Sequence, residues 1–160
     1  MLARVLDTAV AVASGRGDAV TVVLGAHAEQ MARIVREASA SIAVNARFEE
    51  GIASSIRTGV ACAPPSARGV LLLLADQVAV TTDDLRRLVA RWMQDPACIV
   101  AVEYAGSFGA PAIFPRDLFT ELADLDGQGG ARALMLRHPD RVARVSMPTA
   151  AVDVDTPADL

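Results

Sequence analysis

Hydrophobic positions recur in two patterns along the chain, and the two patterns alternate. In the first, apolar residues stand three or four positions apart, which is typical of a helix with one buried face. This spacing predicts helices over residues 2–13, 28–38, 54–62, 85–92, 115–122 and 129–136. In the second, apolar residues are consecutive, which is typical of a strand buried on both faces. Such runs predict strands over residues 19–24, 42–44, 70–75, 99–104, 142–146 and 152–154.

The alternation of helices and strands predicts an α/β fold. Strands without a polar face need helices on both sides, so we expect a doubly wound, mainly parallel sheet as the middle of three layers. No repeat, low-complexity tract or linker interrupts the sequence. Residues 1–160 are therefore expected to form a single domain.

Composition narrows the possible classes of protein. The net charge of −4 argues against non-specific binding to nucleic acid, which needs a basic surface. The first apolar segment is interrupted by Arg4 and Asp7 and is too short to cross a bilayer, so no membrane partner is expected. The two cysteines, Cys62 and Cys98, lack metal-site spacing and are typical of a reduced, cytoplasmic protein. All 15 basic residues are arginine.

Carboxylates stand at the ends of two apolar runs. Asp76 follows the run of four leucines, and Asp153 and Asp155 end the last run on the same side of the chain. Ligands of open α/β sheets bind beyond the carboxyl ends of the strands, where two converging carboxylates can hold Mg²⁺ and the phosphates of a nucleotide. The alternative is that Asp76 caps the next loop and Asp155 caps a turn at Pro157.

Five motifs resemble, in order, those of a known enzyme family. They are EGIASSIRTG (50–59), LLLLADQ (71–77), GSFGAPAIF (106–114), GGARAL (129–134) and DVDTPADL (153–160). The family is that of the molybdenum cofactor cytidylyltransferases, which are related to the molybdopterin guanylyltransferases. VVLGAHAE (22–29) is also similar to the family's second strand and the loop after it. The resemblance covers essentially the whole chain and implies a fold like that of nucleotide-diphospho-sugar transferases.

This resemblance implies an activity. The family transfers a nucleotidyl group, here CMP from CTP, to the phosphate of molybdopterin carrying molybdenum, and releases pyrophosphate. It implies Mg²⁺ as cofactor, with Asp76 as its first ligand, Asp155 as its second and Asp153 as the other candidate. Asp76 and Asp155 are accordingly the candidate catalytic residues. In-line attack on an α-phosphate depends on positioning and charge neutralisation more than on covalent catalysis.

The resemblance also implies two binding regions. Gly51, Ser54 and Ser55 would contact the nucleotide beside Asp76, although Ser54 could instead be an ordinary helix N-cap. The acceptor would lie against residues of two further motifs, namely Gly106, Gly109, Pro111, Gly130 and Arg132. The alternatives there are a plain hairpin turn at residues 106–107 and a flexible connector carrying a surface arginine.

One departure from the family is large. The family opens with a central strand and a glycine-rich loop that resembles LAAGxSxRxGxxK, and this sequence begins with what matches the following helix. SGRGD (14–18) follows a helix and not a strand, so we interpret it as a turn. Without the first strand, its neighbours would face a gap. We therefore expect the chain as written to be impaired, and a version extended upstream to be active.

Other functions stay open at this point. Within the same class, a guanylyltransferase or a sugar-phosphate nucleotidyltransferase is the alternative. From another class, the chain could be a non-catalytic nucleotide-binding or cofactor-delivery module, since it has no lysine. Its partners would be a nucleoside triphosphate, a molybdopterin-type acceptor, and a molybdoenzyme or the chaperone of one.

Several single residues carry weaker signals. His27 is expected at the surface of a helix start, and His138 at a helix end. Cys62, Cys98 and Trp92 are expected to be core residues. Arg57 could point to a phosphate or to solvent, and for an isolated helix arginine we expect solvent.

Overall fold

The computed structural model describes residues 1–14, 19–127 and 129–151, and its strands form two separate sheets. In the first sheet, β1 (Thr21–Leu24) pairs in parallel with β2 (Ser41–Val44). The second sheet has the order β3-β5-β4-β6. Its strands are β3 (Gly69–Leu72), β4 (Ile99–Tyr104), β5 (Ser107–Pro115) and β6 (Val142–Ser146).

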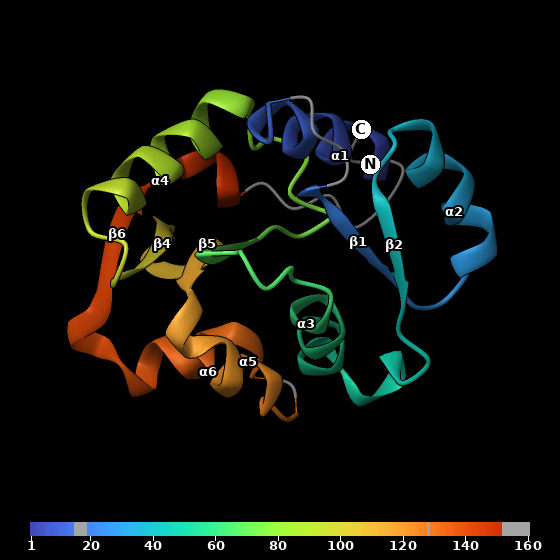
Figure 1. Ribbon diagram of the computed structural model, residues 1–160. Helices are drawn as coiled ribbons and strands as arrows, with labels where there is room; N and C mark the ends of the chain where they lie inside the picture. The colour runs from blue at the N-terminus through green and yellow to red at the C-terminus, as the bar shows by residue number, and fades with distance from the viewer. Residues whose placement is uncertain (15–18, 128, 152–160) are drawn as a thin grey trace.

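Helices cover both faces of the second sheet (Figure 1). The described helices are α1 (Leu2–Val12), α2 (Ala28–Glu37), α3 (Ile52–Ala61), α4 (Thr82–Gln94), α5 (Phe119–Ala123) and α6 (Gly130–Arg137). Short 3₁₀ turns include η2 (Phe48–Glu50), η3 (Arg116–Leu118) and η5 (Pro148–Ala151). No helix among the described residues combines the length and the apolarity that crossing a bilayer requires.

The side chains of β4 show why its sequence is apolar throughout. Ile99 and Ala101 join the core beneath α3, α5 and α6, whereas Val100 and Val102 join the core beneath α4. Successive side chains of a strand point to opposite faces, so a strand between two helical layers needs an apolar residue at every position. The three-layer arrangement is therefore confirmed for this sheet.

The prediction that the sheet is mainly parallel is wrong for the second sheet. Residues 107–115 form β5, which runs antiparallel to both β3 and β4, so the sheet is mixed. Ala105 and Gly106 join β4 to β5 with φ angles of 48° and 73°. Two consecutive positive φ angles are typical of a tight hairpin turn. The turn lies at residues 105–106, one position before the 106–107 turn of the alternative, and contact of this hairpin with the acceptor stays a prediction.

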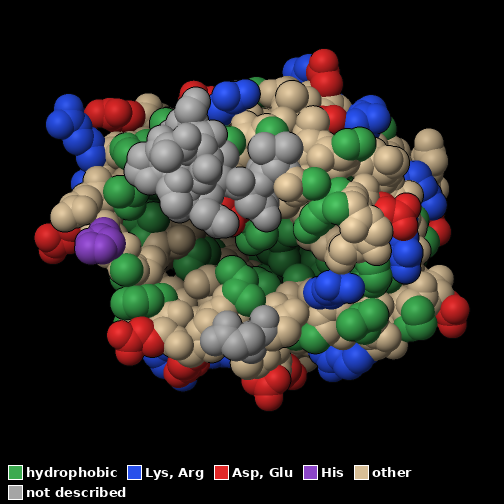
Figure 2. Space-filling view, turned by 180° about the vertical axis from the view of Figure 1, so that it is seen from behind, with side chains coloured by type: hydrophobic (Ala, Val, Ile, Leu, Met, Phe, Trp, Pro, Cys, Tyr) green, Lys and Arg blue, Asp and Glu red, His purple; other side chains and the backbone are tan. Residues whose placement is uncertain are grey.

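Each sheet has two edge strands among the described residues, β1 and β2 in the first and β3 and β6 in the second. β1 is paired with β2 alone, and β3 with β5 alone. β1 packs instead with α1 and α2 in a core of its own, which contains Leu6, Leu24 and Val35. Among the described residues β1 and β3 do not pair with each other, and the strand expected between them stays a prediction. Figure 2 shows the opposite side of the molecule, where hydrophobic side chains line a hollow near the middle.

Candidate functional site

One end of the second sheet brings together Asp76 and the predicted acceptor residues of the β4–β5 hairpin. β3, β4 and β6 run in the same direction and end there, and β5 starts there because it is antiparallel to β4. The turn that carries Asp76, the hairpin turn at Gly106 and the end of β6 are thereby placed at a common edge. Asp153 and Asp155 lie outside the described residues, so their role as ligands stays a prediction.

Asp76 has one oxygen atom that fits a cation. Its Oδ1 atom is buried and has no hydrogen-bond partner among the described residues. A buried acceptor without a donor is costly, whereas a carboxylate oxygen is a favoured ligand of Mg²⁺ and Mn²⁺. No group of three or more His, Cys, Asp or Glu side chains converges within the described part of the chain. Asp76 therefore fits a metal site that needs further oxygen ligands from elsewhere.

Gln77, the next residue, connects three segments of the site. Its side chain is only 1% exposed. The Nε2 atom donates to the carbonyl oxygen of Ala110 in β5 at 2.9 Å and to that of Ala150 in η5 at 3.5 Å. Gln77 belongs to the motif that ends the leucine run, but the sequence alone predicts no role for it.

The start of α3 is held by a buried polar network. Asn45 follows β2 and donates from Nδ2 to the hydroxyl oxygens of Ser54 at 2.8 Å and Ser55 at 3.1 Å. The Oδ1 atom of Asn45 accepts from the backbone N–H of Arg47 at 2.9 Å. Gly51, with φ 96°, is the N-cap of α3, so the alternative that Ser54 is the N-cap is wrong.

The hydroxyl group of Ser54 makes all of its described hydrogen bonds within this network. Its side chain is 2% exposed, and its hydroxyl lies 2.8 Å from the carbonyl oxygens of both Arg47 and Gly51. Ser55 is only half-buried and keeps its own hydroxyl hydrogen available among the described contacts. Ser55 is therefore the more accessible of the two serines, and nucleotide binding by either stays a prediction.

A pocket of about 360 Å³ lies along α3 beside this network. Asn45, Ser54 and Arg57 contribute to its wall. Arg57 was expected to point to solvent, which is wrong. Its guanidinium pairs with Glu50 at 2.7 Å and also donates to the carbonyl oxygen of Leu125, so it ties α3 to two loops.

The predicted acceptor residues lie on the β4–β5 hairpin and at the start of α6. Gly109 and Pro111 are buried in β5, and Gly106 forms the exposed turn. Gly130 has a φ of +52°, and a Cβ atom there would lie 2.9 Å from Cγ2 of Ile52 in α3. The absence of a side chain at Gly130 therefore lets α6 approach α3 closely.

Two arginines lie over the ring of Phe108. The Cζ atom of Arg144 is 4.2 Å from the ring centroid and that of Arg132 is 5.3 Å from it. Arg144 also pairs with Glu103 at 3.3 Å. Sequence reasoning found Arg132 but missed Arg144, whose only signal was a charged residue between the apolar residues of its strand.

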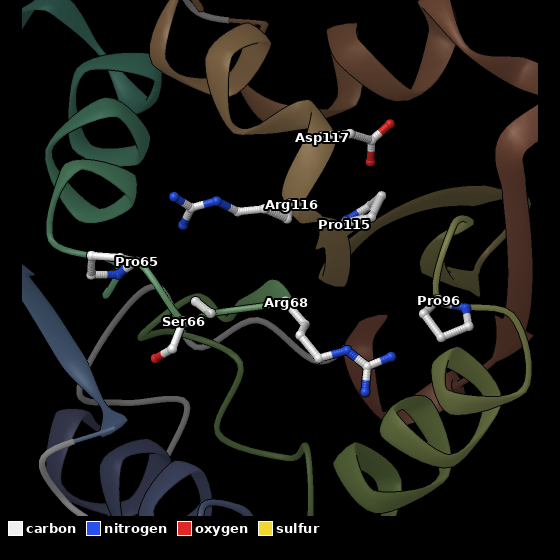
Figure 3. Close-up of a pocket in the computed structure, with 8 residues that line it drawn as sticks. Pro65, Ser66, Arg68, Pro96, Pro115, Arg116 and Asp117 are labelled. Atoms are coloured by element: carbon white, nitrogen blue, oxygen red, sulfur yellow. The ribbon is translucent and has the colours of Figure 1, made fainter.

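A second pocket, of about 580 Å³, lies at the opposite edge of the sheet (Figure 3). Arg68 precedes β3 and Arg116 follows β5, which places both far from the strand ends that carry Asp76. Figure 3 shows their side chains extending in opposite directions. Asp117 at this pocket pairs with Arg141 at 2.9 Å. Because the guanidinium groups of Arg68 and Arg116 point away from each other, they are not arranged to bind one anion together, and this pocket is not the candidate active site.

Comparison with known proteins places this geometry in a family. The family model described as the MobA-like NTP transferase domain matches residues 1–142. The chain belongs to the MobA-like NTP transferase family. Nucleotidyl transfer is the reaction class of this family, and a nucleoside triphosphate is its implied substrate.

Several solved structures are similar to this chain. Rv0371c from Mycobacterium tuberculosis is 30% identical, with a TM-score of 0.69 over 97% of this chain and 80% of that one. Its complex with manganese is 31% identical, with a TM-score of 0.69 over 97% and 83% of the two chains. A nucleotidyl transferase from Methanothermobacter thermautotroptrophicus has a TM-score of 0.77 over 97% and 76%, but its 23% identity supports the fold alone.

A curated relative matches over a shorter stretch. The purine catabolism protein PucB of Bacillus subtilis is 34% identical over 88 residues. This stretch is 54% of the present chain and 42% of PucB, so the match spans less than half of that relative.

The histidines, the cysteines and the tryptophan of this MobA-like chain have no assigned part in the candidate site. His27 is exposed at the start of α2 and His138 is the C-cap of α6, as expected. Trp92 is buried, but Cys62 is exposed and Cys98 is half-exposed, so the prediction that both cysteines belong to the core is wrong. The Cys98 thiol donates to Asp95, and this hydrogen bond raises the pKa of Cys98.

Proposed function

We propose that this chain transfers CMP from CTP to the phosphate of a molybdopterin-type acceptor in a Mg²⁺-dependent reaction. An acceptor phosphate oxygen would bond to the α-phosphorus while the bond from that phosphorus to the bridging oxygen breaks, so pyrophosphate leaves. The single observation that carries the proposal is the buried Oδ1 atom of Asp76, unpartnered among the described residues, at the sheet edge of a MobA-like chain.

Asp76 would hold the cation together with Asp155 or Asp153. Bound there, Mg²⁺ supplies positive charge that offsets the charge of the triphosphate. Manganese in a structure 31% identical to this chain supports a divalent cation, and the oxygen ligand set supports a hard one.

The chain's own residues bind and orient the two substrates. Gly51 and the first turn of α3 up to Ser55 would contact the base and ribose of the nucleotide, and the Asn45 network holds this turn in place. On the other side, Arg132 and Arg144 would bind the acceptor's phosphate above the β4–β5 hairpin. Two arginines with one nearby carboxylate leave a net positive charge, which favours an anion.

The choice of CTP rests on the resemblance of the motifs to cytidylyltransferases, with guanylyl transfer and transfer to a sugar phosphate as alternatives. The test is pyrophosphate release from CTP, GTP, ATP and UTP, each with a molybdopterin-type acceptor and with a sugar phosphate. We expect the highest kcat/KM with CTP and molybdopterin. A clear preference for GTP or for the sugar phosphate would contradict the assignment. Tight binding of CTP without pyrophosphate release would support the non-catalytic module.

A further inference from the structure

Gln77 is a buried polar residue whose hydrogen bonds reach two distant segments. The Nε2 atom donates to Ala110, 33 positions along the chain, and to Ala150, 73 positions along it. Both partners are carbonyl oxygens, which only accept, so the amide nitrogen must face them and the side-chain oxygen must face the other way. This fixes the orientation of the amide group.

The side-chain oxygen of Gln77 is unusual because it is buried without a hydrogen-bond donor among the described residues. Oε1 is buried and has no hydrogen-bond partner among the described residues, and the same holds for Oδ1 of the neighbouring Asp76. Each buried acceptor without a donor is destabilising by about 1–3 kcal/mol. A core built for stability alone would place an apolar side chain here, whereas such costs are tolerated where a site needs the groups.

The two bonds of Gln77 join the segments that surround Asp76. Ala110 lies in β5 between Gly109 and Pro111, which are predicted acceptor residues. Ala150 lies in η5, which ends one residue before the stretch that contains Asp153 and Asp155. Gln77 is thus the residue that connects the Asp76 turn, the acceptor hairpin and the approach to the second acidic motif.

We propose that Gln77 is a positioning residue that fixes the acceptor hairpin and η5 relative to Asp76. It acts through the backbone of these segments and does not itself contact the reacting atoms. The inference rests on the proposed function for the roles of Asp76 and the hairpin, but the hydrogen-bond connection can be tested without any activity.

The test compares Gln77→Met with Gln94→Met. Methionine has a similar length and fills the space but cannot donate hydrogen bonds, and Gln94 is exposed at the end of α4, so it receives the same chemical change without the contacts. Amide hydrogen exchange is measured over residues 107–111 and 147–151, with β1 as the internal reference. Pyrophosphate release gives kcat and KM for acceptor and nucleotide separately.

For Gln77→Met we expect exchange in both segments to quicken about tenfold, with β1 unchanged, because two buried hydrogen bonds are lost. The kcat/KM for the acceptor should fall about tenfold or more, while KM for the nucleotide stays within about twofold. Gln94→Met should match the wild type. If Gln77→Met does not fold, Gln77→Asn serves instead, because its shorter side chain keeps the amide but cannot span both carbonyl groups.

Two results would overturn the proposal. One is exchange that is unchanged in both segments, or that rises equally in β1, since the role would then be absent or purely that of a core residue. The other is a fall in kcat/KM that is equally large for the acceptor and for the nucleotide. If the wild type itself transfers no nucleotide, the proposed function fails, and the exchange result still decides whether Gln77 connects these segments.

Discussion

Arg144 adds a positive charge to the candidate acceptor site from strand β6. In β6 it lies opposite Ala101 of β4, and Phe108 of β5 lies opposite Glu103, so all four residues share one face of the sheet. That face is the one covered by α6, which carries Arg132. The shared face explains why Phe108 can lie beneath both guanidinium groups.

Replacing Arg144 by Gln should therefore weaken binding of the acceptor. We expect KM for the acceptor to rise about five- to tenfold, because one charge-assisted contact to a phosphate is lost, with little change in KM for the nucleotide. Arg86→Gln is the matched control, since Arg86 is exposed on α4 and pairs with Asp83. Steady-state kinetics measure both constants, and an unchanged acceptor KM would remove Arg144 from the site.

At the scale of an element, the start of α4 is held by side-chain hydrogen bonds. Thr81 and Asp84 form a reciprocal capping box. Asp84 also accepts from Arg87 at 2.7 Å and from Thr149 of η5 at 3.1 Å. Burial alone would raise the pKa of Asp84, but these hydrogen bonds together hold it below its ordinary value.

This lowered pKa predicts acid sensitivity. A carboxylate with a lower pKa in the folded state stabilises the protein above its unfolded pKa of about 4, and this stability is lost as the pH falls through the folded pKa. Asp84→Asn should lower the free energy of unfolding by about 1–2 kcal/mol at pH 7. As the pH falls below about 4, the free energy of unfolding of this variant should decrease less than that of the wild type. Urea denaturation between pH 7 and pH 3 measures this. Asp83→Asn is the exposed control, and identical pH profiles for wild type and Asp84→Asn would contradict the prediction.

The contact between α6 and α3 depends on Gly130. An alanine there would be strained by the positive φ and would also press on Ile52, whereas Gly127 has a φ of +63° with no atom within 4 Å of the place that a Cβ atom would take. Gly127→Ala should thus cost about 1 kcal/mol from backbone strain, and Gly130→Ala about 1 kcal/mol more from the clash. Thermal denaturation of both variants tests this, and equal losses would show that the close approach carries no cost.

At the scale of the whole molecule, the two sheets leave β1 and β3 with free edges among the described residues. Free edges expose backbone groups that another strand can pair with. The expectation that a strand belongs between them stays a prediction.

Adding an apolar strand and a glycine-rich, lysine-containing loop ahead of Met1 should fill this position. Stability should rise by several kcal/mol, against a usual total of about 5–15 kcal/mol, and the amides of β1 and β3 should become protected from exchange. The control is an extension of the same length in which prolines replace strand residues and prevent strand pairing. Equal stability and equal exchange in the two extended chains would contradict the prediction.

Sequence periodicity predicted the helices and five of the described strands because those elements bury regular apolar faces. It missed β5, whose sequence SFGAPAIFP contains glycine and two prolines that usually argue against a central strand. The structure accommodates Pro111 because the β4–β5 pairing is irregular between Ala101 and Val102, where residues 110 and 111 have no partner in β4. Pro115 is the last residue of β5.

The site was predictable where one residue carried the signal and not where the signal depended on distant contacts. Asp76 stands out because it ends an apolar run. Asn45, Gln77 and Arg144 gain their roles only from partners brought close by the fold, at separations of 9, 33 and 41 positions.

The most direct test of the account is pyrophosphate release from CTP with Mg²⁺ and a molybdopterin-type acceptor, compared with Asp76→Asn. It is measured for the 160-residue chain and for the chain with the added strand and loop. We expect release that needs both cation and acceptor, that is faster in the extended chain, and that falls about 100-fold in Asp76→Asn, because a neutral amide binds the cation poorly. Release that is unaffected by Asp76→Asn, or no release from either chain with any triphosphate, would contradict the central claim.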